Sequence, residues 1–366
     1  MMKIKQKKIF LIAGMVGLML GITSCPLNNP GGSKPATIYV THTNDNSVTF
    51  FNGTTGAWLN GTLIDSTFTT GTYPFSAAVN SSAEILYVSN QSSQSITFLN
   101  AATGAYINGN LLDSSFGTDG YNYGIAVNPS VNILYVIDNG NNTVKFFNAA
   151  TGALIGNHGV QSDPYYIAVN TSSNIIYAVN SGAETITYLN ATTGDYINGT
   201  LDNSSFQAGN NPGPVEVNPT ANILYVININ DDSVTFFNAT TGAYINGDFA
   251  NSTFPAGDLN SSLSNIAVNP SANILYVTSM TSDTVIFLNT STGVYFFGDL
   301  DSSSFYTGDG PSDVAVDPAT NILYAINIYD DTITYLNART GAYINGNLTN
   351  STFTTGDGPK ALAIKP

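Results

Sequence analysis

The most regular feature of the sequence is a short apolar run around a tyrosine, as in Asn132-Ile133-Leu134-Tyr135-Val136. Near-copies recur along the chain, and their successive tyrosines are 48, 48, 42, 48, 51 and 48 residues apart. These tyrosines are Tyr39, Tyr87, Tyr135, Tyr177, Tyr225, Tyr276 and Tyr324. A repeat of about 40–50 residues with four short strands is typical of propeller blades. The seven copies therefore predict an all-β, seven-bladed β-propeller.

Each unit contains four segments that we interpret as strands. The inner strand, as in residues 124–127 or 313–316, ends at an Asn-Pro or Asp-Pro turn, and the tyrosine motif follows as the second strand. The third strand, as in residues 48–51, is followed by Asn-x-x-Thr-Gly, whose asparagine and glycine suit a tight turn. We expect the outer strand at the next Ala-Tyr-Ile segment, residues 105–107 in the second unit, with a Ser/Thr-Phe segment crossing to the next unit. A shorter crossing through residues 159–164 explains the 42-residue gap.

The two ends of the repeat region are incomplete in complementary ways. The first unit begins at its second strand, near residues 37–40, and the chain ends with an inner strand at residues 358–364. Together these pieces form one four-stranded blade, so the C-terminal strand is expected to close the ring against the N-terminal unit. The predicted propeller domain spans residues 37–366.

The N-terminal segment has the pattern of a lipoprotein signal peptide. Basic residues up to Lys8 precede an uncharged apolar run over residues 9–22, which is short for a membrane span. Residues 22–25, Ile-Thr-Ser-Cys, resemble the lipobox of bacterial lipoproteins, and Cys25 is the only cysteine. We therefore predict cleavage before Cys25, its lipidation, and a flexible tether over residues 26–36. Pro26 after the cysteine, by analogy with lipoprotein sorting, favours the outer membrane.

Charge limits the classes of partner. The chain has a formal net charge of −15, and without the basic N-terminal segment the count is about −19. Such a surface repels the phosphates of nucleic acids, so a nucleic-acid partner is not expected. A cationic partner, a divalent ion or a neutral ligand such as a sugar fits better, and we expect the propeller to be monomeric.

The repeats resemble the YVTN-type and NHL-type β-propeller repeats of bacterial surface and secreted proteins, within the lactonase-like seven-bladed superfamily. The resemblance rests on residues 314–318 (Val-Ala-Val-Asp-Pro), residues 321–325 (Asn-Ile-Leu-Tyr-Ala) and the Thr-Ile-Thr-Tyr strand, and it covers residues 37–366. It implies the fold more strongly than the activity, because such propellers include binding modules, adhesins, lactonases and subunits of larger assemblies.

Acidic side chains gather in the loops between the second and third strands, which usually form one face of a propeller. These loop residues are Asp45, Asp138, Asp231, Asp232, Asp283, Asp330 and Asp331, and Asp313 lies at a crossing. Oxygen-rich sites of this kind suit Ca²⁺, although no EF-hand spacing is present. The residues therefore form a candidate ligand or cation face, or else a solvated polar rim.

Glu216 is the clearest departure from the repeat. The other units have alanine at its place in the inner strand. A carboxylate near the propeller axis is expected to be partnered, ion-bound or protonated, because burying it alone is costly. Within the resemblance it could act as a metal ligand or general base, and otherwise it is a water-linked channel residue. Lys360 is expected to neighbour Asp313 at the ring closure, where the two could form an ion pair.

No nucleophilic triad is recognisable, because the chain has two histidines, no Gly-x-Ser-x-Gly segment and no histidine cluster. We therefore expect a lipid-anchored, non-enzymatic module that recognises a protein or glycan outside the cytoplasm. The alternatives are a lactonase-like hydrolase with a divalent cation near the axis, and a structural subunit of an envelope complex.

Overall fold

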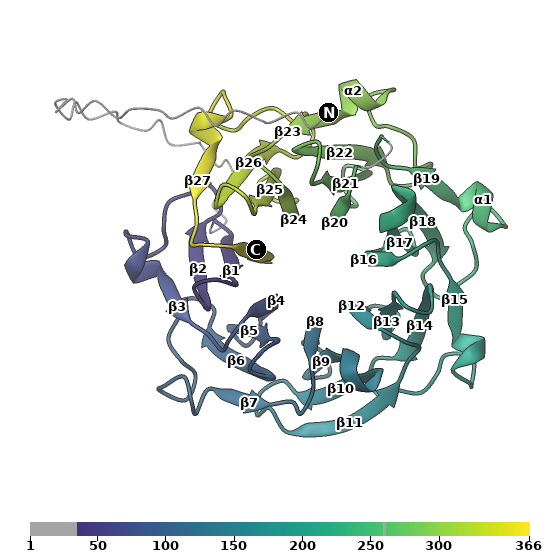
Figure 1. Ribbon diagram of the computed structural model, residues 1–366, viewed down its shortest axis with the longest axis horizontal. Helices are drawn as coiled ribbons and strands as arrows, with labels where there is room; N and C mark the ends of the chain where they lie inside the picture. The colour runs from purple at the N-terminus through teal and green to yellow at the C-terminus, as the bar shows by residue number, and fades with distance from the viewer. Residues whose placement is uncertain (1–34, 259–260) are drawn as a thin grey trace, which may run out of the picture. The chain divides into compact units, whose positions relative to one another are not determined.

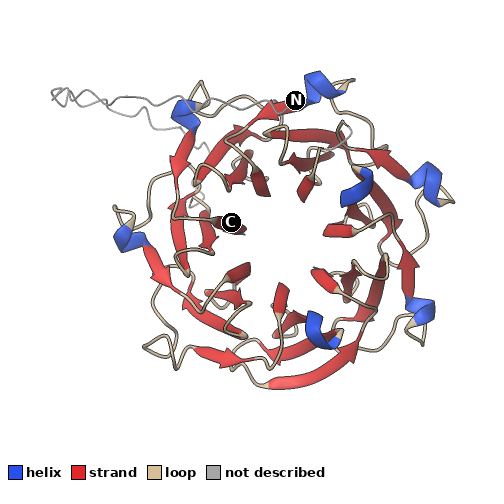
Figure 2. Ribbon diagram, in the orientation of Figure 1, coloured by secondary structure: helices blue, strands red, loops and turns tan. Residues whose placement is uncertain are grey.

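The computed structural model describes residues 35–258 and 261–366. The described residues form seven four-stranded antiparallel sheets arranged as the blades of a ring (Figure 1). This confirms the predicted seven-bladed propeller with four strands per blade. Figure 2 shows that strands dominate every blade and that the few helical turns are short.

The strands fall into four sets by their position in the blade. The inner strands are β4 Pro74–Asn80, β8 Asn122–Asn128, β12 Pro164–Asn170, β16 Pro212–Asn218, β20 Leu263–Asn269, β24 Pro311–Asp317 and β28 Pro359–Lys365. The second strands are β1 Thr37–His42, β5 Ile85–Asn90, β9 Ile133–Asp138, β13 Ile175–Asn180, β17 Ile223–Asn228, β21 Ile274–Ser279 and β25 Ile322–Asn327. The third strands are β2 Ser47–Asn52, β6 Ser95–Asn100, β10 Thr143–Asn148, β14 Thr185–Asn190, β18 Ser233–Asn238, β22 Thr284–Asn289 and β26 Thr332–Asn337. The outer strands are β3 Thr67–Thr69, β7 Ser115–Gly117, β11 Leu154–Gly159, β15 Ser205–Gln207, β19 Thr253–Pro255, β23 Ser304–Tyr306 and β27 Thr352–Thr354.

Ring closure occurs as the truncated ends predict. The C-terminal strand β28 pairs antiparallel with β1, so that Tyr39 lies opposite Ala363. Blade 1 therefore consists of β28 and β1–β3, and blades 2 to 7 follow in chain order from β4. Within residues 35–258 and 261–366, closure of the ring leaves no blade incomplete.

The repeated tyrosines join neighbouring blades. Each is fully buried, and its hydroxyl donates a hydrogen bond to a backbone carbonyl after the third strand of the next blade. Tyr135 of blade 3, for example, donates to Ala191 of blade 4 at 2.6 Å. A buried phenol needs such a partner, so the tyrosine both fills the core and sets the distance between blades.

The Thr-Gly turn is a second contact between blades. In blade 2 the glycine is Gly104, with φ of +72°, and a Cβ there would lie 2.0 Å from the Phe68 ring of blade 1. Phenylalanine of the preceding blade faces this glycine in every blade except blade 4, where His158 takes its place. The glycine is thus required by both conformation and packing.

The prediction for the outer strand was wrong. Tyr106 forms only an isolated bridge to Leu99, and the Ser-Phe segment β7 is the strand that pairs with β6. A turn closed by the Gly109 N–H on the Tyr106 carbonyl takes the chain away from the sheet edge before it returns. Blade 3 lacks this excursion, and β11 runs directly along β10 over six residues.

The helical segments are single turns at the loops. They are α1 Phe249–Ser252, α2 Leu300–Ser303, and the 3₁₀ turns η1 Ile64–Ser66, η2 Asn139–Asn141, η3 Asp202–Ser204, η4 Ile229–Asp231 and η5 Thr349–Ser351. In the described part of the chain, no helix has the length and apolar character needed to cross a membrane.

Candidate functional site

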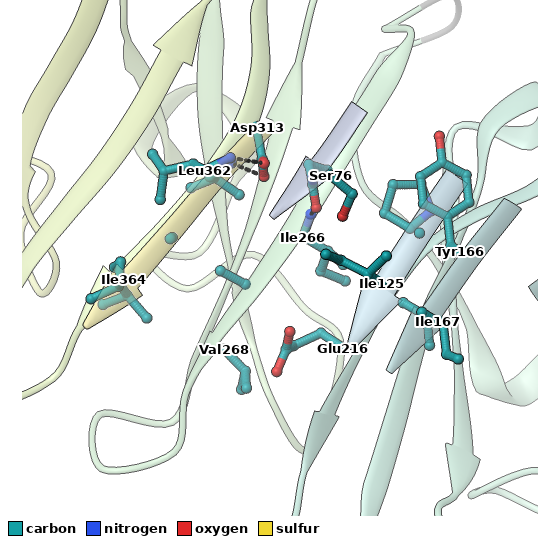
Figure 3. A pocket seen from close by; sticks show the side chains of 18 of the residues that line it. Ser76, Ile125, Tyr166, Ile167, Glu216, Ile266, Val268, Asp313, Leu362 and Ile364 are labelled. Carbon is teal, nitrogen blue, oxygen red and sulfur yellow. Dashed lines mark hydrogen bonds between the residues drawn. The ribbon is translucent and has the colours of Figure 1, made fainter. Parts of the chain in front are cut away.

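Glu216 lies in β16 with its side chain directed toward blade 6. It is paired directly with Tyr225 of β17, and residues opposite each other in an antiparallel pair share one face of the sheet. The Tyr225 hydroxyl donates to the carbonyl of Thr290 in blade 6 at 3.0 Å, which identifies the direction of that face. Where the other blades place a small alanine, blade 5 therefore places a carboxyl group at the wall of the central pocket (Figure 3).

Burial among the inner strands raises the pKa of Glu216 to about 7. The backbone N–H of Val217 opposes this rise in pKa, while the charge of Asp313 adds to it. Glu216 remains partly exposed to solvent, because its carboxyl group borders a pocket that water can enter. A carboxyl group with a pKa near neutrality can both accept and release a proton under physiological conditions.

Asp313 is the second carboxyl group of the pocket, and it joins blade 7 to the C-terminal strand. Its Oδ2 atom accepts a hydrogen bond from the Leu362 backbone N–H of β28 at 2.7 Å, and Oδ1 accepts one from Val314 N–H at 2.7 Å (Figure 3). Burial raises the pKa of Asp313 to about 7, although both hydrogen bonds and the charge of Lys360 act in the opposite direction. Asp313 is therefore held in place by ring closure.

The pocket lies between the inner strands and has a volume of about 500 Å³. Most of its wall is aliphatic, as expected where inner strands meet, but three uncharged polar side chains also border it: Ser76, Tyr166 and Asn265. The Asn265 Oδ1 atom accepts from Ile266 N–H at 2.6 Å, which leaves the amide NH₂ group as the donor of that side chain. Burial raises the pKa of Tyr166 to about 12, so its hydroxyl keeps its proton at neutral pH.

Lys360 neighbours Asp313 but does not form the expected ion pair. The ammonium group lies over the Phe75 ring of blade 2, 4.8 Å from its centre, and no Lys360–Asp313 salt bridge occurs among the described residues. Burial lowers the pKa of Lys360, whereas Asp313 raises it. The lysine therefore acts on Asp313 through space, while Asp313 is hydrogen-bonded to the backbone.

The acidic loop residues do not converge on the pocket. Five of them accept hydrogen bonds from backbone N–H groups of the crossing segments beside them: Asp45 from Asp357, Asp231 from Asn210, Asp283 from Gly310, Asp330 from Asp309, and Asp331 from Gly358. These contacts attach each crossing to the neighbouring loop. The carboxylates of this set thus have a structural use on one face of the ring.

The remaining two acidic loop residues are also separate from the pocket. Asp138 is buried and forms a 2.7 Å ion pair with Lys145 inside blade 3. Asp232 has a left-handed backbone conformation, with φ of +45°, and its carbonyl accepts a hydrogen bond from Ala256 N–H. Across residues 35–258 and 261–366, no three His, Cys, Asp or Glu side chains gather in a way that could hold a metal ion. Cys25, the predicted lipidation site, lies outside the described residues.

A match to a family model shows which protein family the chain belongs to. A model described as a lactonase seven-bladed β-propeller matches residues 156–365, more than half of the 366 residues. The chain belongs to the lactonase family of seven-bladed β-propellers. No match is found among curated proteins.

Solved structures resemble this lactonase-family chain in fold. A candidate 6-phosphogluconolactonase of Bacteroides uniformis aligns with a TM-score of 0.70 at 14% identity, covering 91% of this chain and 100% of the other. A candidate 6-phosphogluconolactonase of Bacteroides fragilis gives a TM-score of 0.68 at 17% identity, covering 91% and 99%. Hydrazine synthase of Kuenenia stuttgartiensis gives 0.65 at 16% identity, covering 82% and 95%. At these identities the likeness shows the fold alone.

Sequence reasoning about this lactonase-family propeller identified Glu216 and Asp313 but missed the polar groups around them. Ser76, Tyr166, Asn265 and Asp313 occupy the same position, the third residue of an inner strand, in different blades. That position varies from blade to blade, whereas the following residues are almost uniformly aliphatic or alanine. Variation within an otherwise regular repeat was the signal that could have revealed the whole pocket.

Proposed function

We propose that this lactonase-family propeller hydrolyses a cyclic ester in the central pocket, with Glu216 as the general base. The observation that carries the proposal is the carboxyl group of Glu216, which replaces alanine at the pocket wall and has a pKa near 7. The family match and the volume of the pocket, about 500 Å³, are consistent with a small substrate.

The proposed reaction requires one water and one lactone. The ionised Glu216 accepts a proton from water while the water oxygen forms a bond to the lactone carbonyl carbon. The ring C–O bond then breaks, and the departing ring oxygen takes the proton back from Glu216, which yields an open-chain hydroxy acid. Tyr166 and Asn265 provide hydrogen-bond donors at the pocket for the negative charge that develops on the carbonyl oxygen.

Turnover of γ- and δ-lactones by the full-length protein tests this proposal. Glu216→Gln preserves the size of the side chain but removes the base, so kcat should fall about 100-fold or more. Glu184→Gln is a matched control, because Glu184 is exposed in a loop and should leave kcat unchanged. Equal turnover by wild type and Glu216→Gln would contradict the role of Glu216.

A non-enzymatic recognition module for a protein or glycan is the competing function. The same assays separate the two, because that function predicts ligand binding in wild type without any hydrolysis. A stoichiometric envelope partner that co-purifies with an inactive protein would instead support a structural subunit. The acidic residues of the loops contribute little to a recognition proposal, since most hold neighbouring segments together.

We further propose that the protein is attached to the bacterial outer membrane through a lipid on Cys25. The proposal is supported by the basic, apolar and Ile-Thr-Ser-Cys segments in succession and by the single cysteine. Cys25→Ala should release the protein from the membrane fraction into the soluble fraction. Retention of the variant in the membrane would overturn the anchor.

A further inference from the structure

We infer that the central pocket accepts an uncharged, polyhydroxylated lactone of pyranose size and rejects its phosphorylated counterpart. The inference concerns the substrate class of the hydrolytic site and so rests on the function proposed above. It follows from the charges at the pocket, the distribution of its hydrogen-bonding groups, and the aromatic side chains that directly precede pocket residues in three inner strands.

The charged side chains that border the pocket are both acids. Glu216 and Asp313 approach it from blades 5 and 7, and in the described part of the chain no lysine, arginine or histidine lines it. The charge of Asp313 raises the pKa of Glu216 and so disfavours its ionisation. A phosphate in the same pocket would add a dianion to a site that already disfavours negative charge.

The lysine and arginine side chains of the described residues make their interactions outside the pocket. Lys145 pairs with Asp138 inside blade 3, and Lys365 pairs with the exposed Glu84. The Arg339 guanidinium donates to Asn321 at the protein surface. The charge of Lys360 acts on the pocket residue Asp313, but its ammonium group lies over the Phe75 ring, and Lys360 is not among the residues that line the pocket. Thus none of the described lysine and arginine residues is among those that line the pocket.

Uncharged polar groups surround the same space. The Ser76 hydroxyl comes from blade 2, the Tyr166 hydroxyl from blade 4 and the Asn265 amide from blade 6. Groups on alternate blades reach a ligand from several directions, which suits a ring that carries hydroxyl groups on different carbons. Each such contact is a neutral hydrogen bond, and together they favour a polyhydroxylated ligand over a simple aliphatic lactone.

Three aromatic side chains in neighbouring blades lie next to pocket residues in the inner strands. Phe75, Tyr123 and Tyr165 directly precede pocket residues in β4, β8 and β12 and remain partly exposed. Their rings contact one another edge to face, with centres 5.0 Å and 4.6 Å apart. The apolar C–H face of a pyranose packs well against such rings.

Paired probes test the inference. Turnover is measured with D-glucono-1,5-lactone and with its 6-phosphate, after subtraction of the spontaneous rates. Binding is measured by calorimetry with D-glucose and D-glucose 6-phosphate, which cannot be hydrolysed, on wild type and Glu216→Gln. We expect kcat/KM and affinity to favour the uncharged member of each pair by about 100-fold in wild type. Glu216→Gln should reduce this preference in binding because one of the two acids is removed.

The outcomes separate the inference from the function on which it rests. Turnover that is equal or faster with the phosphorylated lactone would overturn the inference and leave the hydrolase in place. Absence of turnover, with D-glucose bound more tightly than its phosphate, would overturn the hydrolase and support the ligand class. If neither sugar binds and neither lactone is hydrolysed at millimolar concentration, both the inference and the proposed hydrolase would be overturned.

Discussion

The hydroxyl of Tyr324 donates a hydrogen bond to the carbonyl of Gly53 at 2.9 Å, although the two residues are 271 positions apart. This contact joins blade 7 to blade 1 and is equivalent to the six tyrosine contacts between consecutive blades. The same side chain that sets the spacing within the ring therefore also closes it.

Tyr324→Phe should lower the free energy of unfolding by about 1–2 kcal/mol, because a buried carbonyl loses its donor while the ring packing is kept. Urea unfolding at constant pH measures the loss. Tyr135→Phe is the matched control, since it removes the equivalent bond between blades 3 and 4. Closure makes blade 1 depend on both chain ends, so only Tyr324→Phe should increase proteolysis there. Equal proteolysis patterns in the two variants would contradict a special role in closure.

The two pocket carboxyl groups should make stability depend on pH. Burial raises the pKa of Glu216 from 4.5 to about 7 and that of Asp313 from 3.8 to about 7, so the folded protein holds both protons more tightly than the unfolded chain. Their stabilising contribution is therefore complete below about pH 4 and is lost as the pH rises toward 7. The slope should reach about 1.4 kcal/mol per pH unit for each group.

Urea unfolding between pH 4 and 8 measures this dependence. Glu216→Gln cannot titrate, so the difference between wild type and variant should change through that window and become constant above it. A difference that stays constant from pH 4 to 8 would show that the folded Glu216 titrates normally. Glu184→Gln again serves as the control, because it alters an exposed carboxylate.

The turn glycines distinguish packing between blades from backbone strain. Gly104 and Gly109 have φ of +72° and +90°, but a Cβ would meet the Phe68 ring at Gly104 and nothing within 4 Å at Gly109. Gly109→Ala should cost about 1–2 kcal/mol from backbone conformation alone. Gly104→Ala should cost about 1–3 kcal/mol more because the ring must move. Equal losses in thermal or urea unfolding would show that the blade contact adjusts freely.

Blade 3 contains a buried charge pair where other blades use neutral groups. Asp138 and Lys145 form a 2.7 Å ion pair, and Lys145 also donates to the Thr118 carbonyl. Blade 2 has Asn90 and Thr97 at these places, joined by a 2.9 Å hydrogen bond. Lys145→Met should cost about 3–5 kcal/mol, because it leaves the Asp138 charge buried without its partner.

The double variant Asp138→Asn with Lys145→Thr introduces the neutral pair of blade 2 into blade 3. It should recover most of the stability lost in Lys145→Met, as measured by urea unfolding. A double variant as unstable as Lys145→Met would mean that the shape of the lysine side chain matters more than its charge.

The sequence alone determined the repeat, the number of blades and the closure of the ring. It could do so because apolar periodicity and the two complementary ends are local properties of the chain. It also singled out Glu216, since a carboxyl group in an alanine position is visible by comparing one blade with the next. The tyrosine motif was correctly placed in the second strand, but its hydrogen bond to the next blade depends on atoms about 60 residues away.

Only the tertiary structure decided where the polar side chains act. The outer strand is the Ser-Phe segment rather than the Ala-Tyr-Ile segment, because the Gly109 turn carries the chain away from the sheet edge. Acidic loop residues such as Asp45 bind backbone of the crossing beside them, and Lys360 faces Phe75 rather than Asp313. Asp313 reaches Leu362 because ring closure brings two distant strands together. The periodicity of the sequence predicts which face of a strand is buried. Which residues contact one another across blades depends on how the blades are assembled into the ring.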